Sequence, residues 1–153
     1  MPGTFSQIYI QVVFAVKNRN ALIHSEWEEE LYKYITGIVQ KKGQKMLAIN
    51  GTADHLHIFI GMEPTCCLSD LIREIKKYSS IFIKEKHFTN FRFEWQEGYA
   101  AFSYSHSALR NVIKYVTNQK EHHKLRTFKD EYIDFLQKFN VTYKEQYLFQ
   151  WIE

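Results

Sequence analysis

The chain has 153 residues, of which 45% are hydrophobic and 24% are charged, and its formal net charge is +3. This length suits one domain, which we take as residues 1–153, and this balance excludes a disordered chain. No apolar run approaches the roughly 20 residues that span a bilayer, and the N-terminus lacks the segments of a signal peptide, so we expect a cytoplasmic protein. Adjacent Cys66 and Cys67 exclude an ordinary disulfide and the spacing of a zinc site.

Alternating apolar residues predict a first strand over residues 8–16, with one of its faces buried. A helix follows, for which Ser25 and Glu28 form a predicted capping box. Gly43 supplies the left-handed residue that ends this helix.

The middle of the chain predicts a hairpin of two strands, residues 45–50 and 54–62, followed by an amphipathic helix over 68–83. A further strand is predicted over 98–105. The order strand, helix, strand, strand, helix, strand matches a ferredoxin-like or RRM-like α+β fold. Such a fold is an antiparallel sheet with two helices on one face.

Two more helices are predicted after this unit, over residues 107–123 and 127–139, the second with Thr127 and Asp130 as a capping pair. The aromatic tail, 143–151, carries little charge and several large rings, so we expect it to pack on the surface of the domain.

Two histidines, His55 and His57, alternate within the strand predicted over 54–62. Side chains in a strand alternate between faces, so both imidazoles project from one side of the sheet. Neutral imidazoles in this arrangement suit a divalent metal or a phosphate. Asp54 beside them either orients a histidine or simply ends a turn.

The helix predicted over 107–123 has a polar side that carries Tyr115, Gln119 and His122. Tyr115 and Gln119 are four residues apart and therefore neighbours on the helix surface. Together with the two histidines, the Gln119 carbonyl oxygen would hold Mg²⁺ or Mn²⁺, while the Tyr115 hydroxyl attacks a phosphate. His122 either contacts DNA or metal-bound water, or is favoured there by the helix dipole.

Taken together, several segments resemble the IS200/IS605-type Y1 transposases of the HUH single-strand endonuclease superfamily. The resemblance is carried by the order and spacing of residues 13–19 (VFAVKNR), 55–57 (HLH), 95–103 (WQEGYAAFS), 115–119 (YVTNQ) and 118–123 (NQKEHH). It extends over most of the chain.

This resemblance implies a homodimer that binds hairpin-containing single-stranded DNA at the ends of an insertion sequence. The strand would be cut and rejoined through a 5′-phosphotyrosine, with Tyr115 as the nucleophile. His55, His57 and Gln119 would be the metal ligands. The tyrosine helix would serve its own site or that of the partner protomer.

Basic residues predict where DNA would lie. Lys17 and Arg19 follow the first predicted strand and belong to the resemblance. Four further basic residues lie on predicted helices, where they either contact DNA phosphates or form a solvated face: Arg73, Lys76, Lys77 and Lys114.

Other functions compete with this interpretation. A histidine-triad hydrolase would need a third alternating histidine, but Phe59 stands there. Replication initiators usually carry lysine where Gln119 stands, and relaxases usually carry a third histidine ligand. A non-catalytic RRM-like module would bind single strands by stacking bases on an open sheet face. A domesticated relative that processes palindromes is a further alternative.

Overall fold

The computed structural model describes residues 3–17 and 22–151. Its strands are β1 (Tyr9–Ala15), β2 (Lys45–Gly51), β3 (His55–Gly61) and β4 (Ala100–Tyr104). Its α-helices are α1 (Glu28–Lys41), α2 (Leu68–Glu85), α3 (Leu109–Thr117), α4 (Gln119–His122) and α5 (Phe128–Lys138). Single 3₁₀ turns lie at His106–Ala108 and Glu145–Tyr147.

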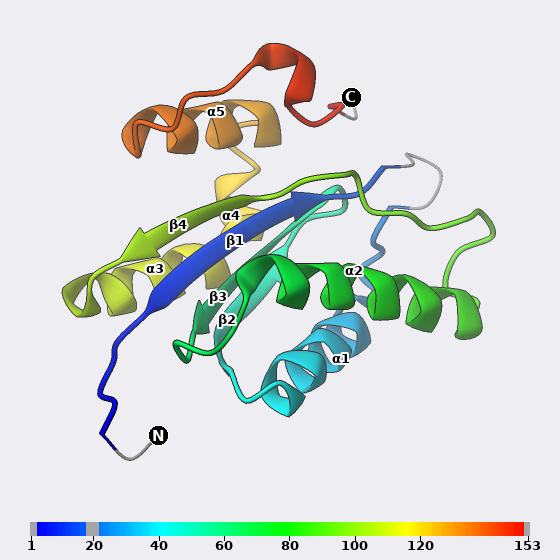
Figure 1. The fold of residues 1–153 in the computed structure, drawn as a ribbon. Helices are drawn as coiled ribbons and strands as arrows, with labels where there is room; N and C mark the ends of the chain where they lie inside the picture. Colours follow the sequence, from blue (N-terminus) through cyan, green and yellow to red (C-terminus); the bar gives the residue numbers. More distant parts are fainter. Residues whose placement is uncertain (1–2, 18–21, 152–153) are drawn as a thin grey trace.

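The four strands form one antiparallel sheet in the order β2-β3-β1-β4, which confirms the predicted α+β architecture. Helices α1 and α2 lie together on one face of this sheet, as Figure 1 shows. The central strands alternate, so Val12 and Phe14 of β1 join Leu56 and Ile58 of β3 in the core beneath these two helices.

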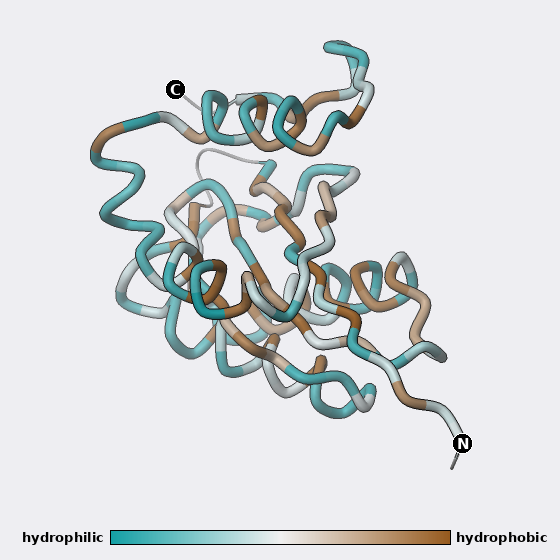
Figure 2. Tube along the Cα trace, turned by 90° about the vertical axis from the view of Figure 1, so that its left-hand side faces the viewer, coloured by the Kyte–Doolittle hydropathy of each residue, from teal (hydrophilic) through white to brown (hydrophobic). Residues whose placement is uncertain are grey.

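The opposite face of the sheet is also covered, so the prediction that the first strand buries one face was wrong. Val13 and Ala15 of β1 are each 1% exposed, because α5 and the aromatic tail pack over them. In Figure 2, α5 at the top of the view alternates between hydrophobic and hydrophilic residues along its turns. This amphipathic pattern explains why α5 packs its apolar face against the sheet.

Helix ends agree with the sequence at two positions and differ at a third. Gly43 has φ 78°, and Thr127 accepts a hydrogen bond from the Asp130 backbone N–H at 3.2 Å. The Ser25 capping box does not form, because α1 begins only at Glu28. The N–H groups of Trp27 and Glu28 instead donate to the His24 carbonyl, and the Trp27 ring stacks on Phe88. Tertiary packing thus overrides the local capping signal.

The helix predicted over 107–123 is divided in the structure. Asn118 leaves helical geometry, with φ −102° and ψ 22°, and separates α3 from α4. Thr and Asn are weak helix formers, which explains the break at this point. The aromatic tail packs on α5 only at its end, where Phe149 is buried with its ring 4.9 Å from that of Tyr132, whereas Tyr143 and Tyr147 are exposed.

Candidate active site

The histidine pair of β3 lies on the sheet face that α3, α4 and α5 cover. Both His55 and His57 are fully buried. The Nδ1 atom of His55 lies 2.8 Å from Oδ1 of Asp54 and 3.0 Å from Oγ1 of Thr52. This places Asp54 where it can orient the imidazole and direct Nε2 of His55 inward.

His55 is also held by an aromatic contact. Its ring stacks on Phe128 at the start of α5, with centroids 3.8 Å apart and an interplanar angle of 4°. Such a pair contributes about 0.5–1.5 kcal/mol beyond burial of its area. The imidazole therefore has little freedom to turn away.

Helix α4 and the residue after it bring the side chains of Gln119 and His123 to the histidine pair of β3. Oε1 of Gln119 lies 3.4 Å from Nε2 of His55 and 3.1 Å from Nε2 of His123. Lys120 fixes the helix, because its ammonium donates to Oδ1 of Asn50 and pairs with Glu28 at 3.0 Å. This anchoring keeps Gln119, which is fully buried, against the histidine pair.

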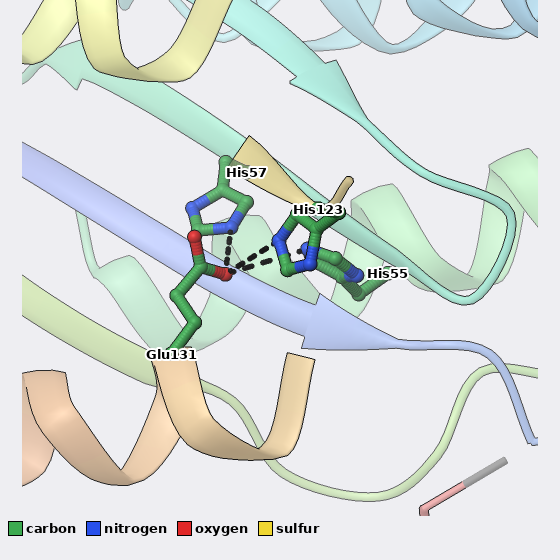
Figure 3. Close-up of side chains that lie close together, drawn as sticks. All are labelled: His55, His57, His123 and Glu131. Atoms are coloured by element: carbon green, nitrogen blue, oxygen red, sulfur yellow. Dashed lines mark hydrogen bonds and ion pairs between the residues drawn. The ribbon is translucent and has the colours of Figure 1, made fainter. Parts of the chain in front are cut away.

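Helix α5 contributes the carboxylate of Glu131, which is 1% exposed. Its Oε1 atom lies 3.0 Å from Nε2 of His57, 3.1 Å from Nε2 of His123 and 3.5 Å from Nε2 of His55. Figure 3 shows the three rings and the carboxylate converging from the sheet, from the segment after α4, and from α5. Four groups from three parts of the chain thus share one small volume.

These four groups could hold a divalent metal. One ligand atom from each of His55, His57, His123 and Glu131 lies within 4.8 Å of the others. Ligand atoms about 2 Å from one ion lie about 3–4 Å apart, so small side-chain movements suffice. The Gln119 oxygen, in contact with two of the rings, is placed to add a fifth ligand.

The electrostatics of the cluster suit a cation. Burial would raise the pKa of Glu131, but the charge of His57 and the hydrogen bonds from the imidazoles outweigh it and hold that pKa below its usual range. Burial lowers the pKa of His57 despite the nearby carboxylate. For His55, burial would lower the pKa, but hydrogen bonds to Asp54 and Glu131 raise it. Glu131 is therefore ionised, and burial favours the neutral form of His57, which is the form that binds metals.

Tyr115 of α3 lies at the edge of this cluster. Its hydroxyl donates a hydrogen bond to Oε2 of Glu131, and its ring centroid is 6.0 Å from that of His57. Burial, together with the negative charge of Glu131, raises the pKa of the phenol above its ordinary value. Tyr115 thus stays protonated at neutral pH unless a cation offsets that charge.

The sequence directed attention to His122, whereas the structure brings His123 to the cluster. The His122 ring stacks on Tyr115, with centroids 4.5 Å apart. His123 stands four residues after Gln119, so helical spacing could have placed it on the same face. Glu131 was also missed, although a carboxylate among the apolar positions Phe128 and Tyr132 was a usable signal.

Four of the predicted DNA contacts, Lys17, Arg73, Lys76 and Lys77, line a single groove of about 1150 Å³. It runs between α2 and the segment from His87 to Tyr99. Lys76 already donates to two carbonyl oxygens there, those of Gln96 at 2.9 Å and Gly98. Lys114 is exposed on α3, away from the residues that line the groove. Arg19 lies outside the described residues.

The groove and the histidine cluster adjoin the same end of the sheet. The backbone N–H of Gln96, which lines the groove, donates to the carbonyl of Ala15 at the end of β1, and Ala15 pairs with His55. Just beyond β1, the N–H of Lys17 donates to the carbonyl of Glu94. The groove, however, lies on the α2 side, and the cluster lies on the α5 side.

Residues 4–119 match the family model described as "Transposase IS200 like". The match spans most of the chain, so this protein belongs to the IS200-like transposase family. The family model ends at Gln119, before His123 and Glu131. No curated protein shows significant sequence similarity to the chain.

Two solved structures share the fold. A protein described as a candidate transposase from Deinococcus radiodurans R1 superposes with TM-score 0.61 at 18% identity, covering 76% of this chain and 94% of its own. A REP-associated tyrosine transposase bound to a REP hairpin superposes with TM-score 0.62 at 13% identity, covering 98% of this chain and 96% of its own. None of the helices within residues 3–17 and 22–151 is both long and apolar enough to cross a membrane.

Proposed function

We propose that this transposase binds hairpin-containing single-stranded DNA at the ends of an insertion sequence and cuts and rejoins the strand through Tyr115. One observation carries the proposal: the Tyr115 hydroxyl reaches the carboxylate of Glu131, whose other oxygen contacts the histidine cluster. The nucleophile and the candidate metal ligands thus belong to one hydrogen-bonded group.

The proposed reaction exchanges one phosphate ester for another. The phenolic oxygen of Tyr115 bonds to phosphorus, and the 3′ oxygen of the neighbouring nucleotide leaves and takes up a proton. The products are a 5′-phosphotyrosine and a free 3′-OH. In rejoining, a 3′-OH attacks the phosphotyrosine, and Tyr115 regains its proton.

We further propose that His55, His57 and Gln119 hold Mg²⁺ or Mn²⁺ in this reaction. Such an ion would polarise the scissile phosphate and stabilise the negative charge that develops on it. The chain itself excludes water from the site, since Phe128 and Phe135 pack against the histidines. Asp54 would keep His55 oriented toward the ligand position.

The groove beside α2 supports the binding half of the proposal. Lys17, Arg73 and Lys77 give it a basic lining, and Phe91, which is 55% exposed, offers a ring for an unpaired base. The likeness to a transposase bound to a REP hairpin supports hairpin DNA as the substrate class. We also propose a homodimer, which sedimentation of the intact protein would test.

A palindrome-processing role is the second candidate. It is favoured by the superposition with the REP-associated transposase, which covers 98% of this chain and therefore includes the C-terminal helices. A non-catalytic RRM-like module is disfavoured, because α3 and α5 bury the sheet face on which bases would stack.

A covalent-adduct assay tests the proposal. Labelled single strands that carry hairpins from the DNA flanking the gene are incubated with the protein and Mn²⁺, then separated under denaturing conditions. The wild type should retain label on the protein, whereas Tyr115→Phe should bind the hairpin and form no adduct. Hairpins present as flanking pairs of one element favour transposition, and dispersed single palindromes favour the second role. Adduct formation by Tyr115→Phe would refute the nucleophile assignment.

A further inference from the structure

We propose that Glu131 links the metal to the nucleophile: Oε1 ligates the ion that the histidines hold, while Oε2 holds the Tyr115 hydroxyl. The inference rests on the proposed function, because it presupposes that Tyr115 is the nucleophile and that a metal binds the histidines. It assigns to α5, beyond the stretch that defines the family, a direct part in the reaction.

The two oxygens of the carboxylate have separate partners. Oε1 faces Nε2 of His57 and of His123, at 3.0 and 3.1 Å. Oε2 accepts the hydrogen bond from Tyr115. An ion among the imidazoles would therefore meet Oε1, while Oε2 would keep its bond to the hydroxyl.

The position of Glu131 argues for such a role. A carboxylate that is 1% exposed on an amphipathic helix is costly to bury unless charged or hydrogen-bonded partners offset the cost. Here every partner comes from another element: His57 from β3, Tyr115 from α3, and His123 from the segment after α4. Glu131 thus contacts both the tyrosine hydroxyl and the imidazoles.

Rigid surroundings would make the link effective. Phe128, three positions before Glu131, and Tyr132, directly after it, are buried in the core between α5 and the sheet. The Phe135 ring, one turn further along α5, lies 5.6 Å from that of Tyr115 and 6.3 Å from that of His57. The carboxylate therefore fixes where the hydroxyl lies relative to the ion.

Calorimetric titration with Mn²⁺ in the absence of DNA tests the link. The proteins are the wild type, Tyr115→Phe, Glu131→Gln and the double variant. We expect Glu131→Gln to weaken Mn²⁺ binding by about 10–100-fold, and Tyr115→Phe to weaken it by about tenfold, as loss of a ligand's hydrogen-bond partner does. In the Glu131→Gln background, Tyr115→Phe should have no further effect, because the linking carboxylate is gone.

Two variants serve as controls. Asp130→Asn makes the same chemical change at the neighbouring, exposed position of α5 and should leave Mn²⁺ affinity unchanged. Glu131→Asp keeps the charge but shortens the reach. If Glu131→Gln fails to fold, as circular dichroism would reveal, Glu131→Asp decides: it should bind Mn²⁺ with an affinity that no longer depends on Tyr115.

Three results would overturn the inference. The first is Mn²⁺ binding by Glu131→Gln as tight as, or tighter than, that of the wild type, because Glu131 would then merely occupy the metal position. The second is an equal effect of Tyr115→Phe with and without Glu131, and the third is an unchanged dependence on Tyr115 in Glu131→Asp. An absent DNA adduct in the wild type would instead refute the proposed function, which the metal titrations do not probe.

Discussion

The hydroxyl of Tyr115 and the carboxylate of Glu131 are joined by a hydrogen bond, although the two residues stand 16 positions apart on different helices. Through that carboxylate, the tyrosine is connected to three histidines that come from β3 and from the segment after α4. The candidate active site is therefore assembled from the central sheet and from every helix that covers its second face.

Adjacent histidines should differ in their effect on metal binding. His123 contacts Gln119 and Glu131 through Nε2, whereas His122 stacks on Tyr115. We expect His123→Ala to weaken Mn²⁺ binding at least about tenfold and His122→Ala to leave it nearly unchanged. Calorimetry on both variants provides the comparison, each variant serving as the control for the other. Unchanged Mn²⁺ affinity in His123→Ala would show that His123 is no ligand.

The metal preference should follow the ligand set. Imidazole nitrogens predominate among the donor atoms, and nitrogen ligands favour Mn²⁺ over Mg²⁺, which prefers oxygen. Adduct formation at limiting metal should therefore need less Mn²⁺ than Mg²⁺. Titration of both ions against a fixed amount of protein and hairpin DNA measures the difference. A lower requirement for Mg²⁺ would indicate that fewer of the histidines bind the ion.

The groove beside α2 should contribute to DNA affinity through charge. Replacing Arg73 or Lys77 by Ala should lower the slope of log affinity against log salt by about 0.9 for each phosphate on a hairpin stem that the side chain neutralises. Lys33→Ala, an exposed change on α1 outside the groove, is the matched control. Fluorescence anisotropy of a labelled hairpin over a salt series gives the slopes. Identical slopes for all four proteins would place the DNA elsewhere.

Lys76, which lines the groove, should also make the free energy of unfolding depend on pH. Burial lowers the pKa of Lys76 from 10.5 to about 8. Between about pH 8 and 10.5 the unfolded chain binds more protons than the folded one. The contribution of Lys76 to the free energy of unfolding therefore increases with pH across this window. Urea unfolding at pH 7.5, 9 and 10 measures the free energy of unfolding of the wild type and of Lys76→Met. The value for the wild type should increase relative to that for Lys76→Met as the pH rises. A constant difference would mean that the two carbonyl acceptors keep the ammonium charged.

Much of the framework was predictable from local patterns. The strand containing His55 and His57 alternates so regularly that both imidazoles had to share a face, and the spacing of Tyr115 and Gln119 placed them one helical turn apart. The two residues stay in contact despite the break at Asn118, since Nε2 of the Gln119 side chain donates to the Tyr115 carbonyl at 3.3 Å. The resemblance drawn from these motifs agrees with the family to which the chain belongs.

Local patterns were less informative where packing decides. The Ser25 capping box was a reasonable prediction, but the burial of Trp27 against Phe88 moves the start of α1 to Glu28. Burial of the second face of β1 was not predictable from the sequence. Val13 and Ala15 are compatible with an exposed face as well as with a buried one, and it is α5 that covers them.

Local sequence patterns predict the order of the elements, the common face of His55 and His57, and the helical pairing of Tyr115 with Gln119, because each pattern involves residues two to four positions apart. That His123 and Glu131 complete the cluster follows from the tertiary packing alone. Glu131 reaches His57 across 74 residues of chain, and it does so because α5 buries its apolar side on the sheet. Contacts over such distances arise from the packing of whole elements, which no local periodicity records.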